Sequence, residues 1–221
     1  RAGAAPASVS REGAPMPKKT LWYIVHENLA ASRGNRALLK AAEGLPGTTV
    51  VDLYAEYPDF AIDAAREQQR LRDHDLIVFQ HPFYWYSTPA LLKQWQDKVL
   101  TYGFAYPPKE GDALHGKGWL SVVTTGGPDW SYQAGGYNNF TMSELLRPLQ
   151  QTAYLCGMRW LPPFVVHGVL GGDYGPIKAT TDAQLAELAA RLRALVAGVD
   201  LAAGHSLEPV ATVHELKARA R

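Results

Sequence analysis

The sequence predicts an α/β fold, a doubly wound five-stranded parallel sheet with the strand order 2-1-3-4-5. First, five short apolar runs alternate with amphipathic stretches, which is a β–α pattern repeated along the chain. Second, the central run, Leu76–Phe79, is continuously apolar, as expected for a strand buried on both faces of a parallel sheet. Third, 221 residues with 47% hydrophobic side chains suffice for a single domain with its own core.

Composition excludes several classes of protein. The formal net charge of +1 gives no reason to expect a nucleic-acid partner, and no apolar run is long enough to span a bilayer. The single cysteine, Cys156, rules out an intramolecular disulfide and a cysteine-based zinc knuckle. Because a lone cysteine suits a reducing compartment, we expect a cytoplasmic protein.

We expect three segments in the chain. Residues 1–19 are rich in Ala, Gly, Pro and Ser, lack periodicity and have no apolar stretch of the signal-peptide kind, which predicts a disordered arm. Residues 20–199 carry all the predicted strands and helices and form the domain. Residues 200–221 are predicted to be a tail that lies on the surface or on a partner.

The first two β–α units occupy the stretch up to Arg72. The strands are expected at Leu21–Val25 and Thr48–Leu53, joined by a helix that Ser32 caps and that runs to Ala42. An irregular connection, Tyr54–Asp63, then leads to a polar helix over Ala64–Arg72.

The third unit is organised around the central strand. Because proline lacks a donor for a sheet ladder, His81-Pro82 is expected to end the strand that Leu76–Phe79 forms. Thr88 is a suitable N-cap, with Pro89 at the first helical position. The helix that follows has its apolar residues at three- and four-residue spacing, which places one face on the sheet: Leu91, Leu92, Trp95 and Val99.

The last two units follow an aromatic, proline-broken excursion over Tyr102–Pro108. Strands are expected at Trp119–Thr125 and Trp160–Val169, the second at a sheet edge because it carries Pro162-Pro163 near its start. Helices are expected from Thr141 to Leu155, with a capping box completed by Glu144, and from Asp182 to just before Gly198.

In the order 2-1-3-4-5, which is the flavodoxin-like one, the loops after strands one, three and four meet at one rim of the sheet, where open α/β folds bind ligands. These loops offer a helix N-terminus at Ser32, the aromatic run Phe83–Tyr86 and the pair Gly126-Gly127. Taken singly, each has an ordinary explanation: a capped helix, rings that pack on a helix or at a dimer interface, and a turn. Together they suit FMN better than a nucleoside triphosphate.

Other motifs are absent or misplaced. Gly111–Lys117 resembles a phosphate-binding P-loop, but it precedes a strand, and Gly118 stands where Ser or Thr would hold magnesium. The sequence has no G-x-G-x-x-G, G-x-S-x-G or H-E-x-x-H motif. Its seven histidines are scattered, so no metal site is expected.

Three stretches carry a family resemblance: His81–Trp95, Thr124–Gly127 and Trp160–Phe164. In these motifs the chain resembles the flavodoxin-fold NAD(P)H:quinone oxidoreductase family, and it is most similar to the ancillary subunits of glutathione-regulated potassium-efflux systems. The resemblance runs from about Thr20 to Val196.

The resemblance implies that the chain binds FMN, with FAD as the alternative flavin. The implied cofactor-binding residues form a phosphate loop with the histidine before it, a ring-binding loop and a second flavin loop: His26, Ser32, Arg33, Gly34, Asn35; Phe83, Tyr84, Trp85, Tyr86; Thr124, Thr125, Gly126, Gly127. Tyr132 matches a tyrosine that helps the flavin accept hydride, and is the implied catalytic residue. Mammalian members have a histidine several residues after this tyrosine, where this chain has Tyr137-Asn138-Asn139. A proton relay through that histidine therefore does not carry over to this chain.

The implied reaction is a two-electron ping-pong transfer in which NADPH or NADH gives hydride to flavin N5 and a quinone or similar small acceptor is reduced. The resemblance also implies a homodimer with the site at the subunit boundary. A second hypothesis is a regulatory ancillary subunit that binds a potassium/proton antiporter at the inner face of the membrane, with incidental redox activity. A third, a flavodoxin-type electron carrier, fits less well because the chain is neither acidic nor equipped with one Ser/Thr/Gly-rich phosphate loop.

Overall fold

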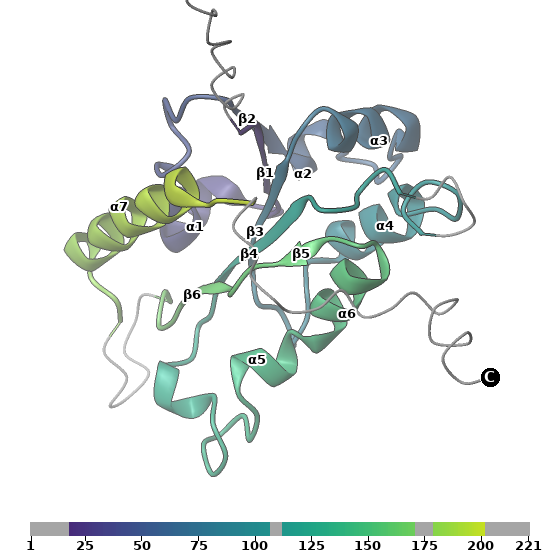
Figure 1. The fold of residues 1–221 in the computed structure, drawn as a ribbon. Coiled ribbons are helices and arrows are strands. Elements are labelled where there is room, and N and C mark those ends of the chain that lie inside the picture. Colours follow the sequence, from purple (N-terminus) through teal and green to yellow (C-terminus); the bar gives the residue numbers. More distant parts are fainter. Residues whose placement is uncertain (1–17, 107–111, 171–178, 202–221) are drawn as a thin grey trace, which may run out of the picture.

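The computed structural model describes residues 18–106, 112–170 and 179–201. A parallel sheet forms the middle layer, with helices on both faces (Figure 1). The strand order is β2-β1-β3-β4-β5, and β6 pairs with β4, so the predicted order 2-1-3-4-5 is confirmed. The strands are β1 (Thr20–Ile24), β2 (Thr48–Asp52), β3 (Leu76–Pro82), β4 (Gly118–Thr124), β5 (Arg159–Trp160) and β6 (Phe164–Val166).

The helices divide between the two faces of the sheet (Figure 1). On one face lie α1 (Arg33–Leu39) and α7 (Asp182–Gly198). The other face carries the rest: α2 (Leu53–Glu56), α3 (Ala64–Arg72), α4 (Ala90–Val99), α5 (Met142–Leu145) and α6 (Arg147–Leu155). This division is the doubly wound arrangement that the β–α pattern predicts.

The larger core lies between the sheet and α2 to α6. At its centre the Tyr23 and Phe79 rings stack with 5.4 Å between centroids, and Trp95 and Trp119 pack against Phe79 at 5.3 and 4.5 Å. All four side chains are at most 1% exposed. The smaller core, under α1 and α7, is aliphatic apart from Trp22.

One prediction about the central strand was wrong. We expected His81-Pro82 to end the ladder, but β3 pairs with β4 as far as Pro82. The Val25 N–H bonds to the Gln80 carbonyl and the Phe83 N–H to the Thr124 carbonyl, so strand alternation turns the Pro82 nitrogen toward β1. Because β1 has already ended at Ile24, no partner there needs the donor that proline lacks.

Prolines and caps also moved several boundaries. The strand expected over Trp160–Val169 is split into β5 and β6 around Pro162-Pro163, and the helix expected to Leu155 is split before Pro148. The capping box of Thr141 and Glu144 is confirmed. Several smaller boundaries differ. Pro89 rather than Thr88 is the N-cap of α4, and α1 ends at Leu39. α2 begins at Leu53, the expected last residue of the second strand, and extends into the expected irregular connection.

Both predicted terminal segments lie largely outside the described residues, which begin at Lys18 and end at Leu201. Of the expected excursion Tyr102–Pro108, the last two residues also lie outside. Within the described part of the chain, no helix is long and apolar enough to cross a membrane. The same part holds no cluster of His, Cys, Asp and Glu with the geometry of a metal site.

Candidate functional site

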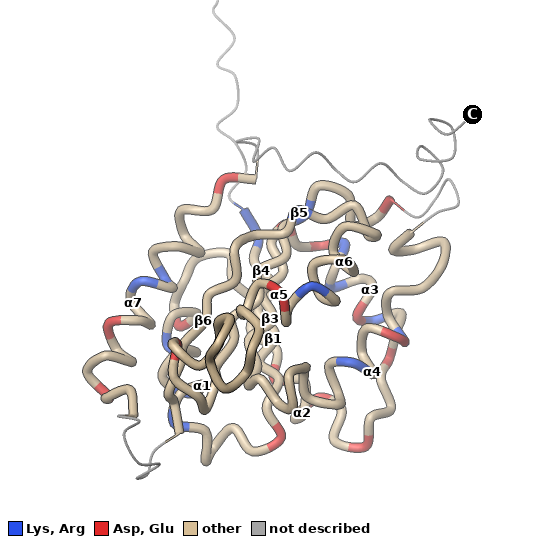
Figure 2. The backbone as a smooth tube through the Cα atoms, turned by 90° about the horizontal axis from the view of Figure 1, so that it is seen from below, with Lys and Arg blue, Asp and Glu red and all other residues tan. Residues whose placement is uncertain are grey.

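The loops that follow β1, β3 and β4 leave the sheet at its carboxyl edge. Figure 2 looks at the molecule from this side, and the loop after β4 shows little charge. Between Thr125 and Ser143, Asp129 is its single charged residue. Direct hydrogen bonds between the loops, described below, hold this rim together.

The loop after β1 ends in a helix N-terminus with unused donors. Asn28 caps a short 3-10 turn over Leu29–Ala31 by accepting from the Ala31 N–H at 3.2 Å, and Ser32 is the N-cap of α1. The first-turn N–H groups of α1, those of residues 33–35, have no hydrogen-bond acceptor among the described residues. Free N–H groups at the positive end of a helix suit a phosphate.

A buried polar network supports this loop from below. The Asn35 side-chain amide donates to Ser32 Oγ at 3.1 Å and to Thr124 Oγ1 at 3.0 Å. The Gln80 amide donates to the Asn35 carbonyl at 2.7 Å and accepts from Trp22 Nε1 at 2.9 Å. Sequence analysis missed Gln80 and Trp22, although a glutamine in the middle of an apolar strand was an available signal.

Arg33 and Gly34 face a different part of the molecule. Arg33 Nε bonds to Asp182 Oδ1 at 2.7 Å, and its guanidinium also contacts the carbonyls of Val169 and Thr180. A Cβ on Gly34 would lie 2.9 Å from the Val169 side chain. Both residues therefore join α1 to the segment between β6 and α7, and Arg33 has its charge neutralised there.

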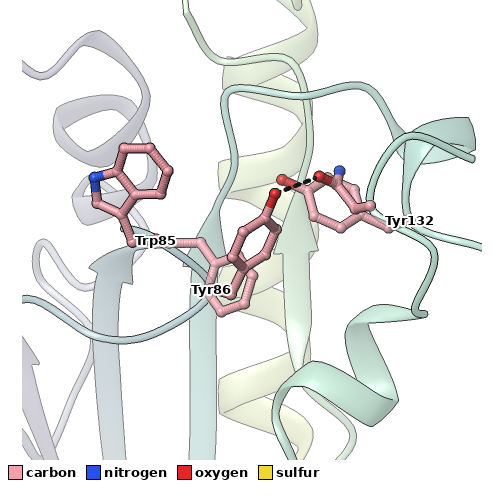
Figure 3. Close-up of a pocket in the computed structure, with 5 residues that line it drawn as sticks. Trp85, Tyr86 and Tyr132 are labelled. Atoms are coloured by element: carbon pink, nitrogen blue, oxygen red, sulfur yellow. Dashed lines mark hydrogen bonds between the residues drawn. The ribbon is translucent and has the colours of Figure 1, made fainter.

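The aromatic loop after β3 is a tight turn with unusual backbone angles. Tyr84 and Ser87 form an antiparallel bridge, and the two residues between them have positive φ, 47° at Trp85 and 61° at Tyr86. Such turns normally contain Asn or Gly, so a Trp-Tyr pair here costs conformational energy. The Trp85 side chain is 92% exposed and turns away from Tyr86 and Tyr132 (Figure 3). Strain combined with an exposed indole is typical of a binding site.

Tyr84 ties the aromatic loop to the loop after β1. Its hydroxyl donates to Glu27 Oε1 at 2.9 Å and lies 3.3 Å from His26 Nε2. Burial and the bond to Glu27 raise the pKa of Tyr84 to about 12. His26 Nδ1 accepts from the Asn28 N–H at 3.0 Å, and burial lowers the pKa of this imidazole. At neutral pH both groups therefore keep the loops together as uncharged partners.

The loop after β4 uses its glycines for close packing. A Cβ on Gly126 would come within 2.5 Å of Leu170 Cδ1, and one on Gly127 within 3.3 Å of the Tyr132 ring. Neither glycine has positive φ, so the conformational freedom that a glycine pair allows is not used here. The benefit is a bare backbone beside Tyr132.

Five side chains line a shallow pocket of about 180 Å³ between these loops: Phe83, Trp85, Tyr86, Tyr132 and Asn138 (Figure 3). The Tyr86 hydroxyl donates to Asn138 Oδ1 at 3.0 Å, and the Phe83 ring lies edge-on to Tyr86 and Tyr132 at 6.3 and 6.4 Å. Sequence analysis did not assign Asn138 to the site. Its side-chain amide also donates a hydrogen bond to Ser131 Oγ at 3.0 Å, which fixes its position. Burial raises the pKa of Tyr132, so its phenol stays protonated at neutral pH.

His167 is a further residue at this rim that sequence analysis missed. It follows β6, and its ring lies against Tyr132 with 5.2 Å between centroids. Its Nδ1 is 2.9 Å from Thr125 Oγ1, and burial lowers the pKa of the imidazole. No local motif marks this residue, because the contact depends on β6 pairing beside β4.

Comparisons with known proteins identify relatives of this chain. The chain is 52% identical over 151 residues to the glutathione-regulated potassium-efflux system ancillary protein KefG of Serratia proteamaculans, covering 68% of this chain and 82% of that protein. General stress protein 14 of Treponema denticola, solved in complex with FMN, is 35% identical with a TM-score of 0.73, over 80% of this chain and 97% of that one. An NADPH-quinone reductase of P. pentosaceus is 35% identical with a TM-score of 0.70, over 82% of this chain and 99% of that one.

The family model described as the flavodoxin-like fold matches residues 18–194, which is most of the chain and all of the sheet. The match includes every loop that forms the rim described above. The chain therefore belongs to the flavodoxin-like fold family.

Proposed function

We propose that the protein is an FMN-dependent NAD(P)H:quinone oxidoreductase. The observation that carries this proposal is the meeting of a helix N-terminus, a strained aromatic turn and a bare glycine backbone at one rim. Support comes from the general stress protein 14 structure with FMN and from the NADPH-quinone reductase, both 35% identical to this chain.

The residues at the rim fit FMN. The free first-turn N–H groups of α1 and the Ser32 hydroxyl are donors for its phosphate. Phe83, Tyr84, Trp85 and Tyr86 offer aromatic surface for a flat ring system. Gly126 and Gly127 leave the backbone of 124–127 without side chains, so its peptide groups can meet a ligand directly. The space that a Cβ would take is already filled, by Leu170 at Gly126 and by Ser131 and Tyr132 at Gly127. His26 and Asn35 hold the loops in place from behind.

FMN, when bound, supplies the hydride chemistry. The chain binds and orients the cofactor, and its aromatic side chains keep water away from the reacting face. Tyr132 keeps its phenolic proton at neutral pH because burial raises its pKa, so its Oη can donate a hydrogen bond at the site. We assign this donor the catalytic role, with Asn138 and Tyr86 shaping the opening in which NADPH or NADH and then a small acceptor bind.

The test is a titration of the purified protein with FMN, followed by anaerobic NADPH or NADH and then a quinone. Bound flavin absorbing near ~450 nm that bleaches with the nicotinamide and recovers with the quinone is the expected result. Absence of FMN binding would overturn the proposal. Bound FMN that neither nicotinamide reduces would remove the reductase activity and leave a flavin-binding protein.

We also propose that the protein is a homodimer whose second copy completes each site. The pocket of about 180 Å³ is smaller than the ~300 Å³ at which ligand pockets usually begin. Two aromatic residues at its rim are largely exposed, Trp85 at 92% and Tyr137 at 73%. Exposed aromatic rings of this kind are common in subunit interfaces. Sedimentation equilibrium should give a dimer, and Trp85→Ser should favour the monomer. A monomeric wild type that binds FMN normally would contradict this.

The second candidate function is that of an ancillary subunit on a potassium/proton antiporter. It is favoured by the identity of 52% to KefG, whose name places it in a potassium-efflux system. The predicted tail, residues 200–221, lies outside the described part of the chain beyond Leu201 and carries several Lys and Arg. Co-sedimentation with antiporter-containing membranes, with and without this tail, tests the idea. Equal recovery of both forms would exclude the tail as the dock, and recovery of neither would exclude the partner.

A further inference from the structure

His167 is fixed on three sides at the ring end of the candidate site. Its backbone carbonyl accepts from Thr180 Oγ1 at 2.6 Å, and the next N–H, that of Gly168, donates to the Gly127 carbonyl at 3.0 Å. Its side chain reaches Thr125 at 2.9 Å and contacts the ring of Tyr132. The imidazole therefore bridges the 124–127 loop and the residue to which we assign the catalytic role.

The hydrogen bonds determine which nitrogen of His167 carries the proton. Thr125 Oγ1 has a single hydrogen, which it donates to the Gly127 carbonyl at 2.8 Å. It must therefore accept at its contact with His167, so Nδ1 is the protonated nitrogen of the neutral ring. Nε2 keeps the lone pair and is the atom that gains a proton on acidification. This second protonation leaves the bond to Thr125 intact.

The described residues around His167 bring little positive charge. None of the five residues that line the pocket is a cation, and Asp129 is the carboxylate that faces His167. Arg33, the charged group on α1 nearest to this segment, is already bonded to Asp182 and to the carbonyls of Val169 and Thr180. Within the described residues, His167 is thus the group that can add a positive charge beside Tyr132.

We propose that His167 is a positioning residue that holds Tyr132 and the 124–127 loop together, and that its protonation strengthens the binding of an anionic flavin. The inference rests on the proposed function, because FMN brings a phosphate of charge about −1.5 to −2 at neutral pH. An added cation at the ring end attracts such a ligand through its net charge, from a distance, because the phosphate itself is placed at the α1 end of the site. The coupling must be reciprocal. FMN affinity should rise as His167 takes up its proton, and bound FMN should raise the pKa of His167.

The direct test follows the imidazole of His167 by NMR in histidine-labelled protein, with and without FMN, as the pH is lowered from 8 to 5. We expect Nε2 to titrate while Nδ1 stays protonated, and the titration to move to higher pH when FMN is bound. An unchanged or lowered titration midpoint in the complex would overturn the electrostatic part. A neutral form protonated on Nε2 would overturn the contact with Thr125.

The second test compares FMN dissociation constants over the same pH range for wild type, His167→Asn and His167→Phe, with the exposed His115→Gln as the control. An asparagine amide can replace Nδ1 as the donor to Thr125 but cannot gain a proton, so His167→Asn should bind FMN normally at pH 8. Near pH 5.5 it should lack an enhancement on the order of fivefold, the lower end of site coupling. His167→Phe keeps a ring against Tyr132 but loses the donor, and should bind more weakly at every pH.

The FMN phosphate titrates identically with every variant, so differences between pH profiles report on His167 alone. Parallel profiles for wild type and His167→Asn would refute the inference while the proposed function stands. Absence of FMN binding by the wild type would refute both, and the two failures are therefore distinguishable. If His167→Phe fails to fold, the NMR titration of the wild type still tests the inference, because it needs no variant.

Discussion

Two buried polar networks, one on each face of the sheet, differ in what they can affect. On the face of α3 and α4, the fully buried Glu67 accepts from Tyr23 at 2.5 Å, Tyr57 at 2.8 Å, Trp95 at 2.9 Å and Arg70 at 2.5 Å. All of these donors belong to the larger core or its edge. The first network therefore stabilises the fold without reaching the candidate site.

The second network, on the face of α1, ends at the candidate site. Gln80 and Asn35 connect Trp22 in the smaller core to Ser32 and Thr124 at the rim. Its members are neutral, an indole N–H, two amides and two hydroxyls, whereas the first network holds an ion pair. Buried polar groups on the face of α3 and α4 therefore stabilise the fold alone. Those on the face of α1 stabilise the fold and also position two loops of the candidate site.

The largest expected effect on stability comes from Glu67→Ala. The substitution removes the buried partner of Arg70, which keeps its second ion pair with Glu56 at 3.2 Å. It also leaves three buried donors unsatisfied, and we expect a total cost of about 3–5 kcal/mol in the free energy of unfolding. Urea denaturation should detect this, with the exposed Glu187→Ala as the control. A loss below ~1 kcal/mol would show that the ion pair is dispensable for folding.

The next effect concerns His81, a buried group in β3 whose Nε2 has no hydrogen-bond partner in the described structure. Burial lowers the pKa of His81 to about 4, while an unfolded chain has the ordinary value near 6.5. The native state thus binds fewer protons, so stability is complete above pH ~6.5 and is lost progressively down to pH ~4. The loss amounts to roughly 3 kcal/mol. Urea denaturation of wild type and His81→Leu at pH 7 and 4.5 should show a smaller acid loss in the variant; equal losses would contradict the assignment.

A moderate effect is expected for Gln80→Leu, which tests the second network. The Trp22 N–H and the Asn35 carbonyl lose their partner, and each unsatisfied buried group costs about 1–3 kcal/mol. Because Asn35 orients Ser32 and Thr124, FMN should also bind about tenfold more weakly. Glu67→Gln serves as the comparison. As long as this variant is folded, its FMN affinity should stay within about twofold of wild type, however much stability it has lost. If FMN affinity fell by a similar factor in both variants, the two networks would not differ in their effect on the site.

The smallest effect on stability is expected for Gly126→Val, at the rim itself. Its new Cβ meets the end of the Leu170 side chain, which is 52% exposed and free to move, so unfolding should change by less than ~1 kcal/mol. A branched side chain there blocks close approach to the backbone, and FMN affinity should fall more than about tenfold. Fluorescence titration with FMN checks this, with Gly198→Ala as the control. Unchanged affinity in the folded variant would remove this loop from the site.

Patterns in the sequence are enough to predict the doubly wound class, the strand order and the meeting of three loops at one rim. Those properties follow from local periods, caps and the handedness of crossovers, which act over a few residues or apply to all parallel sheets. The apolar run of β3 and the capping box at Thr141 and Glu144 are examples.

Other properties depend on the packing of distant segments. Pro82 stays in a strand, and Gln80, Asn138 and His167 lie at the rim or directly beneath it. Pro82 is tolerated because a neighbouring strand ends early, which no property of its own segment predicts. His167, which is 35 positions after Tyr132 in the chain, meets it because β6 pairs with β4. Contacts of this kind depend on how distant segments pack, so a local pattern in the sequence carries no trace of them.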